Sequence, residues 1–138
     1  MTKIYVAGKY GTPRVEQLME DITNSEDHEL TCDWRTFPPD CKPYIERVSQ
    51  NRPLADNMVQ SVKDADLFIL VLHDGLYGAM VELGVALAEG KRVWVGMEFD
   101  EGEKVEHRES IFLCSTNVKY MDLEIIRENL YLPATIKV

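Results

Sequence analysis

The pattern of apolar and polar positions along this chain alternates between short apolar runs and longer amphipathic segments. The apolar runs predict five strands, at residues 3–8, 29–34, 66–73, 91–97 and 117–121. The run DLFILVLH at 66–73 is so uniformly apolar that both of its faces must be covered. That property indicates a central strand of a parallel sheet.

The segments between the strands carry apolar residues at helical spacing. They predict helices at residues 13–24, 54–65, 79–90 and 122–130. Pro13 suits a first helical turn, and Gly90 suits the residue that follows a last turn. A short helical segment is also predicted within 44–51, and Pro53 is expected to end it.

Strands that alternate with helices predict an α/β fold with an open, parallel, five-stranded sheet, flavodoxin- or Rossmann-like, and helices on both faces. The 138 residues suit a single domain over 1–138, and 45% of them are hydrophobic, which is enough for one core. Ligands of such sheets bind beyond the carboxyl ends of the strands, where the strand order switches. A site is therefore expected at the loops after 3–8, 66–73 and 91–97.

One carboxylate, Glu82, stands inside the second apolar run of FILVLHDGLYGAMVELGVALAEGKRVWV. Burying a lone carboxylate costs several kcal/mol unless the group is paired or used. Its place about one turn into the helix after the central strand puts it near the ligand edge and near a helix N-terminus, whose dipole favours an anion. The alternative is an exposed helix carboxylate, but the flanking apolar residues leave little polar face, so a functional role is favoured.

The loop GKYGTPR at 8–14 is the second candidate. Gly8 would let a ligand approach the backbone, and Lys9 and Arg14 would attract an anion at the following helix N-terminus. The G-K-[ST] ending of a P-loop is missing. A tight turn with two surface cations remains the alternative.

The other candidates carry weak signals by themselves. Tyr5, inside the first strand, would ordinarily be a packing residue, and Asp56, Asp74 and Asn117 would be ordinary loop or cap residues. His73 follows the central strand without a nucleophile motif. The three histidines, at 28, 73 and 107, are scattered, so neither a metal nor another cofactor is predicted.

Charge and composition narrow the function further. The net charge of −9 disfavours binding to a nucleic acid polymer, although it allows a small anion in a local basic pocket. The three cysteines form no C-x-x-C pair and indicate reduced thiols. No apolar stretch suits a signal peptide or a membrane span, so we expect a cytoplasmic protein without a membrane partner. Residues 98–109 are predicted to form a solvated acidic loop.

Taken together, these segments resemble the nucleoside 2-deoxyribosyltransferase superfamily, which includes nucleotide N-glycosidic hydrolases. Its members look like I-Y-x-x-G, then A-D before a central strand, then G-x-x-x-E-x-G-x-A-x-x-x-G-K-x-V. The matching residues are Ile4, Tyr5, Gly8, Ala65, Asp66, Gly78, Glu82, Gly84, Ala86, Gly90, Lys91 and Val93. The resemblance covers most of the chain, and the block around Glu82 is its most specific part.

The resemblance implies roles for these residues. Glu82 would be the nucleophile that attacks the anomeric carbon of a deoxyribose and displaces the base, with retention overall. Tyr5 would orient that carboxylate. An asparagine from a neighbouring subunit completes the site in the family, and Asn117 is the nearest match, so a homo-oligomer is expected. The implied partners are a nucleoside or nucleotide and a free base.

The chain also departs from the family. Six residues before the nucleophile, relatives that use nucleosides carry aspartate and nucleotide hydrolases tend to carry serine, but here that residue is Leu76. Asp74 is the nearest substitute, and Asp56 is an approximate counterpart of an aspartate that contacts the base. Lys9 and Arg14 favour a phosphate, whereas the block around Glu82 favours a nucleoside.

The sequence is therefore compatible with several functions. Transferase and hydrolase differ only in what resolves the intermediate. A non-catalytic nucleotide-binding protein on the same fold is the alternative, and Leu76 supports it. A flavodoxin-like signalling domain would explain neither Glu82 nor Tyr5.

Overall fold

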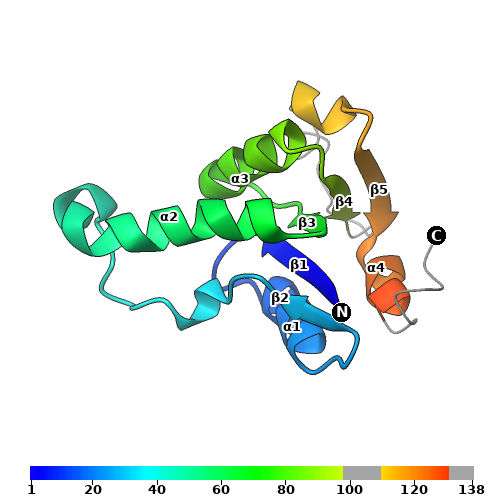
Figure 1. The fold of residues 1–138 in the computed structure, drawn as a ribbon, viewed down its shortest axis with the longest axis horizontal. Helices are drawn as coiled ribbons and strands as arrows, with labels where there is room; N and C mark the ends of the chain where they lie inside the picture. The colour runs from blue at the N-terminus through cyan, green and yellow to red at the C-terminus, as the bar shows by residue number, and fades with distance from the viewer. Residues whose placement is uncertain (98–109, 131–138) are drawn as a thin grey trace.

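The computed structural model describes residues 1–97 and 110–130, and their core is a parallel sheet of five strands (Figure 1). The strands are β1 Thr2–Ala7, β2 His28–Leu30, β3 Leu67–Val71, β4 Arg92–Met97 and β5 Val118–Asp122. Their order is β2-β1-β3-β4-β5, and every neighbouring pair is parallel. The predicted five-stranded α/β fold is confirmed, and the order switches between β1 and β3.

Within the described residues, four α-helices cover the two faces of this sheet. They are α1 Pro13–Thr23, α2 Val48–Asp64, α3 Tyr77–Ala88 and α4 Leu123–Leu130. Helices α2 and α3 pack together on one face, and α1 and α4 lie on the other (Figure 1). Short 3-10 helices are found at Trp34–Thr36 (η1), Tyr44–Arg47 (η2) and Ile111–Cys114 (η4).

The register of the strands decides which side chains meet. Tyr5 of β1 is opposite Phe68 of β3, so both side chains point toward the face that α2 and α3 cover. Residues one step along the strands point to the other face. Gly96 of β4 is one of them, and a side-chain carbon there would lie 3.0 Å from Cδ1 of Ile126 in α4.

Two predicted boundaries were wrong. Pro53 does not end a helix, because α2 runs without a break from Val48 to Asp64 and Pro53 lies inside it. Proline removes one N–H from the helix, and the carbonyl four residues earlier belongs to the exposed Ser49, where water can replace the lost partner. Strand β2 ends at Leu30, before the expected 34, because the Asp33 side chain accepts a hydrogen bond from the Arg35 N–H and caps η1. The predicted acidic loop at 98–109 lies outside the described residues.

Candidate active site

The Glu82 carboxylate lies beside the first strand, where its Oε2 accepts a hydrogen bond from the Tyr5 hydroxyl. Tyr5 is fully buried within β1, whereas Glu82 is the sixth residue of α3 and is half-buried. Seventy-seven residues separate the two along the chain. The connection between β3 and α3 turns the chain back over the β1/β3 switch point and brings them together.

Burial raises the pKa of the Glu82 carboxyl from its ordinary 4.5 to about 8. We expected the helix dipole to favour the anion here. Glu82 is six residues into the helix, beyond the first turn over which the dipole acts strongly, so burial dominates. A carboxyl group with this pKa keeps its proton in much of the neutral range, and it becomes an anion when the pH rises or when a bound group stabilises the charge.

Packing fixes the ring of Tyr5. It stacks on Phe68 with ring centroids 5.7 Å apart and parallel planes. The parallel register of β1 and β3 places these residues directly opposite each other, so the ring is held on one side by a neighbouring strand. The hydroxyl is thereby held at a constant position relative to Glu82, as an orienting group requires.

The loop after β1 has both a packing role and a position at the site. A side-chain carbon on Gly8 would lie 2.9 Å from Cγ2 of Val15, so glycine is needed there for α1 to pack against the strand. Lys9 is exposed. A carbon added to Gly75, in the turn after β3, would lie 3.8 Å from Nζ of Lys9. The ammonium group therefore lies beside that turn, on the carboxyl edge of the sheet.

Arg14 also links the loop after β1 to the connection between β3 and α3. Its Nη2 donates a hydrogen bond of 2.7 Å to the carbonyl of Leu72, the residue after β3. The guanidinium is thus committed at least in part to the backbone. We predicted Arg14 as a ligand contact, and the structure assigns it a second role, the support of the connection that leads to Glu82.

The connection between β3 and α3 also contains His73, Asp74 and Leu76, the residue at which the chain departs from the family pattern. His73 Nδ1 donates to the carbonyl of Asp74 at 3.0 Å, and Gly75 has a φ of +71°, which a side chain would strain. Asp74 is exposed at this turn. Leu76 precedes α3 and packs against the core, so it presents no polar group.

Gly78 follows at the start of α3. A side-chain carbon there would meet nothing within 4 Å, so no packing contact explains the glycine. Open space beside a helix N-terminus fits the predicted approach of a ligand.

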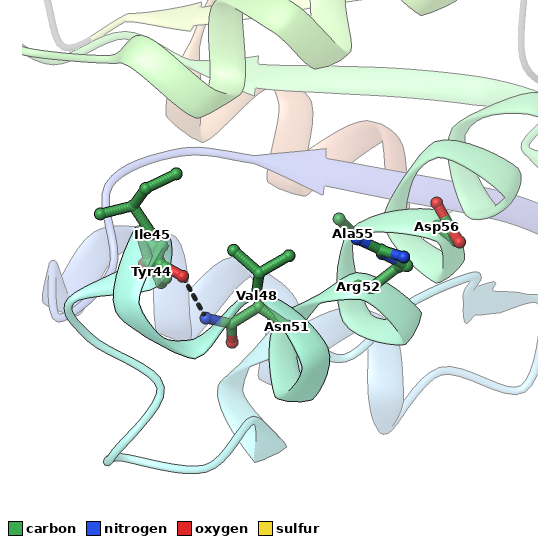
Figure 2. A pocket seen from close by; sticks show the side chains of 7 residues that line it. All are labelled: Tyr44, Ile45, Val48, Asn51, Arg52, Ala55 and Asp56. Carbon is green, nitrogen blue, oxygen red and sulfur yellow. Dashed lines mark hydrogen bonds between the residues drawn. The ribbon is translucent and has the colours of Figure 1, made fainter.

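Two other predicted residues lie elsewhere. Asp56 lines a cavity of about 390 Å³ at the start of α2, together with Tyr44, Ile45, Val48, Asn51, Arg52 and Ala55. In Figure 2 the Ile45, Val48 and Asp56 side chains point to the same side of this segment, and Asn51 donates to the Tyr44 carbonyl at 3.3 Å. Neither Tyr5 nor Glu82 lines this cavity.

Asn117 lies at the amino end of β5, where its carbonyl accepts a hydrogen bond of 3.0 Å from the Val93 N–H. In a parallel sheet this is the edge opposite the one where Glu82 lies. Within one chain, therefore, the structure does not bring Asn117 to Glu82.

The described residues also bear on metals and membranes. Among residues 1–97 and 110–130, no three His, Cys, Asp or Glu side chains gather in a way that could hold a metal ion. Over the same residues, no helix has the length and apolar character that crossing a bilayer requires.

Sequence reasoning missed two supporting residues, Phe68 and Leu72. Both lie in the apolar run of the central strand and have no polar side chain to mark them. The parallel pairing of β1 with β3 could have indicated Phe68. The Leu72 carbonyl is a backbone group, and no sequence pattern signals it.

Solved structures with this fold include enzymes of N-glycosidic chemistry. A CMP N-glycosidase of Clostridium botulinum superposes with a TM-score of 0.57 at 18% identity, over 94% of this chain and 99% of that one. A 2-deoxyribosyltransferase of Bacillus psychrosaccharolyticus gives 0.57 at 17% identity, over 99% and 96%. A conserved protein of Enterococcus faecalis V583 gives 0.54 at 18%, over 94% and 97%. No family model and no curated protein matches the sequence.

Proposed function

We propose that this chain, which has the fold of the nucleoside 2-deoxyribosyltransferase superfamily, cleaves or transfers the N-glycosidic bond of 2′-deoxynucleosides or their 5′-monophosphates. The observation that carries the proposal is the hydrogen bond from the buried Tyr5 hydroxyl to Glu82 at the β1/β3 switch point. A carboxylate held in this way, at the edge where such sheets bind ligands, suits a nucleophile. Two proteins with a similar structure, a CMP N-glycosidase and a 2-deoxyribosyltransferase, are named for activities of this chemical class.

The reaction proceeds in two displacements. Deprotonated Glu82 attacks the anomeric carbon through the oxygen that Tyr5 does not hold, and the bond from that carbon to the base nitrogen breaks. The bonding electron pair leaves with the base, which takes up a proton. A glycosyl ester on Glu82 remains, and either a second base or water attacks it, which restores the carboxylate and retains the configuration.

The turn after β3 supplies the groups for the sugar and its 5′ end. Lys9, beside Gly75, is the better placed of the two predicted cations for a phosphate, because Arg14 donates to Leu72. Asp74 accepts from a sugar hydroxyl, and Gly78 leaves room for the ligand at the start of α3. Gly8 keeps the backbone of the loop after β1 close to the ligand, whereas Asp56 lines a cavity that neither Tyr5 nor Glu82 lines and is left out of this site.

A second candidate is a nucleotide-binding protein without catalysis. Leu76 favours it, because this residue packs against the core where relatives carry a polar side chain. Against it stands Glu82, whose burial raises its pKa at a stability cost that simple binding does not require.

A panel of 2′-deoxynucleosides and 5′-monophosphates, with and without an acceptor base, tests the proposal, and chromatography measures the free and exchanged base. We expect release or exchange by the wild-type chain and none by Glu82→Gln. Binding of nucleotides without turnover of any substrate would establish the second candidate instead. We expect the wild-type chain to bind a 5′-monophosphate more tightly than the corresponding nucleoside. Lys9→Gln should reduce this difference in affinity, and added salt should reduce it too.

A further inference from the structure

Trp34 lies beside the carboxyl end of β1 and the loop that follows it. Its side chain is 6% exposed, and its indole Nε1 donates a hydrogen bond of 2.8 Å to the carbonyl of Val6, the residue after Tyr5 in β1. The ring of Tyr10, within the loop, packs against the Trp34 ring, and the ring centroids are 6.1 Å apart. Trp34 therefore contacts the chain both before the loop and inside it.

The Trp34 indole continues the hydrogen bonding of β1 where β2 has ended. Just after β2, the Thr31 N–H donates a hydrogen bond of 2.9 Å to the Ile4 carbonyl. In a continued parallel ladder, the N–H two residues later, that of Asp33, would bond the Val6 carbonyl. The chain turns into η1 instead, and the indole takes this carbonyl. A buried carbonyl without a partner is costly, so the indole is needed to fix the end of β1.

The residues on either side of Trp34 hold η1 against α1. Asp33 accepts a hydrogen bond from the Arg35 N–H and forms an ion pair with the Arg35 guanidinium at 2.8 Å. The same guanidinium forms an ion pair with Glu20 of α1 at 3.0 Å. Trp34 is thus a fixed support for the loop, because its own backbone is tied to a helix.

Lys9 belongs to the part of the loop that Trp34 supports. Its carbonyl accepts a hydrogen bond of 3.3 Å from the Thr12 N–H, and Gly11 has a φ of +80°, so residues 9–12 form a tight turn. At the other end of the side chain, Nζ would lie 3.8 Å from a side-chain carbon on Gly75. A shift of this turn would therefore move the ammonium group away from the connection between β3 and α3.

We propose that Trp34 is a positioning residue, which holds the loop after β1 and so keeps the Lys9 ammonium beside the turn that leads to Glu82. It acts through Lys9 and not by contact with a ligand, since its indole N–H is bonded to Val6. The consequence for ligands rests on the proposed function: a 5′-monophosphate depends on the placement of Lys9, whereas the corresponding nucleoside does not.

Amide hydrogen exchange, measured by NMR, tests the support of the loop without any ligand. Trp34→Phe keeps an aromatic ring but removes the indole N–H, so exchange at the Thr12 amide should become about tenfold faster. The matched control is Trp94→Phe, which removes an indole of the same 6% exposure from β4, a strand that β3 separates from β1. This control should leave the Thr12 rate unchanged. Tyr10→Ala changes an exposed residue, so it tests the same support even if Trp34→Phe does not fold, and it should accelerate exchange by a smaller factor.

Calorimetric titration with a 2′-deoxynucleoside 5′-monophosphate, and with its nucleoside, tests the placement of Lys9. Trp34→Phe should weaken binding of the monophosphate by about tenfold and leave binding of the nucleoside close to wild type, whereas Trp94→Phe should change neither. Thr12 exchange at the wild-type rate in both Trp34→Phe and Tyr10→Ala would overturn the proposal. So would equal losses of affinity for the two ligands in Trp34→Phe. A wild type that binds neither ligand would contradict the proposed function, and hydrogen exchange would still decide whether Trp34 holds the loop.

Discussion

The two faces of the sheet are built differently. On the side of α1 and α4, glycines let the helices approach closely: Gly8 lies against Val15, and Gly96 lies against Ile126. Arg127 of α4 also forms an ion pair with Asp21 of α1 at 2.8 Å, which links the two helices at the protein surface. Helices α2 and α3 cover the other side (Figure 1). There the sheet buries Tyr5, whose hydroxyl donates a hydrogen bond to the carboxyl group of Glu82.

The two sides therefore contribute differently: one supplies mainly stabilising contacts, and the other holds the group proposed for catalysis. Close packing and paired charges stabilise the α1 and α4 side, whereas the α2 and α3 side keeps a carboxyl group whose burial raises its pKa. A site of this kind costs stability, because an anion there lacks the hydration that it has in water. Substitutions on the two sides should therefore affect different measurements.

The largest effect is expected for Glu82→Gln. The amide keeps the size of the side chain but cannot attack carbon, so turnover should fall at least about 10³-fold. The matched control is Glu89→Gln at the exposed end of the same helix, which should change turnover little. If Glu82→Gln turned over substrate at the wild-type rate, Glu82 would not be the nucleophile.

The pH dependence of stability should show the cost of Glu82. Its pKa is about 8 in the folded chain against an ordinary 4.5, so between these values the folded state holds a proton that the unfolded state has lost. The free energy of unfolding contributed by this group is therefore complete below about pH 4.5 and falls as the pH rises through 8.

Denaturation of the wild type and of Glu82→Gln at several pH values measures this contribution. Between pH 5 and pH 8.5, the free energy of unfolding of the variant should rise relative to that of the wild type by on the order of a few kcal/mol. Parallel curves for the two proteins would contradict the raised pKa.

Gly8→Ala should lower stability through the side of the sheet that α1 and α4 cover. The added carbon would lie 2.9 Å from Val15, so we expect a loss of about 1–3 kcal/mol in the free energy of unfolding. Gly78→Ala is the matched control. Its added carbon meets nothing, and alanine is the better helix former, so stability should hold or rise by up to about 1 kcal/mol. If a ligand approaches Gly78, that variant should lose substrate affinity instead.

The smallest effect is expected for Arg127→Gln. This variant removes a partly exposed ion pair with Asp21, whose contribution to the free energy of unfolding is about 1 kcal/mol or less. Turnover should not change, because the pair lies on the face of the sheet away from Glu82. A large loss of activity would show that the two sides are coupled.

Much of the fold could be predicted from the sequence, because apolar runs and helical periodicity determine the type of each element. All five strands and the helices over α1, α3 and α4 were expected near their observed positions. The break at Pro53 was wrong, because exposure of Ser49 lets water satisfy the carbonyl that proline leaves unpaired.

The site was predictable only in part. Glu82 was found because a carboxylate in an apolar run is unusual, and the resemblance implied its pairing with Tyr5. The bond from Arg14 to the Leu72 carbonyl and the contact of Gly8 with Val15 depend on how α1 crosses the strands, which local pattern does not specify.

The most direct test of the central claim is the mass of the intact chain after brief reaction with a 2′-deoxynucleoside and acid quenching. A covalent intermediate on Glu82 predicts a species heavier than the free chain by one deoxyribosyl group, and peptide mapping should locate the addition in α3. Glu82→Gln should form no such species. Base release by the wild type without any adduct, under conditions where chemistry outpaces breakdown of the ester, would contradict nucleophilic catalysis by Glu82.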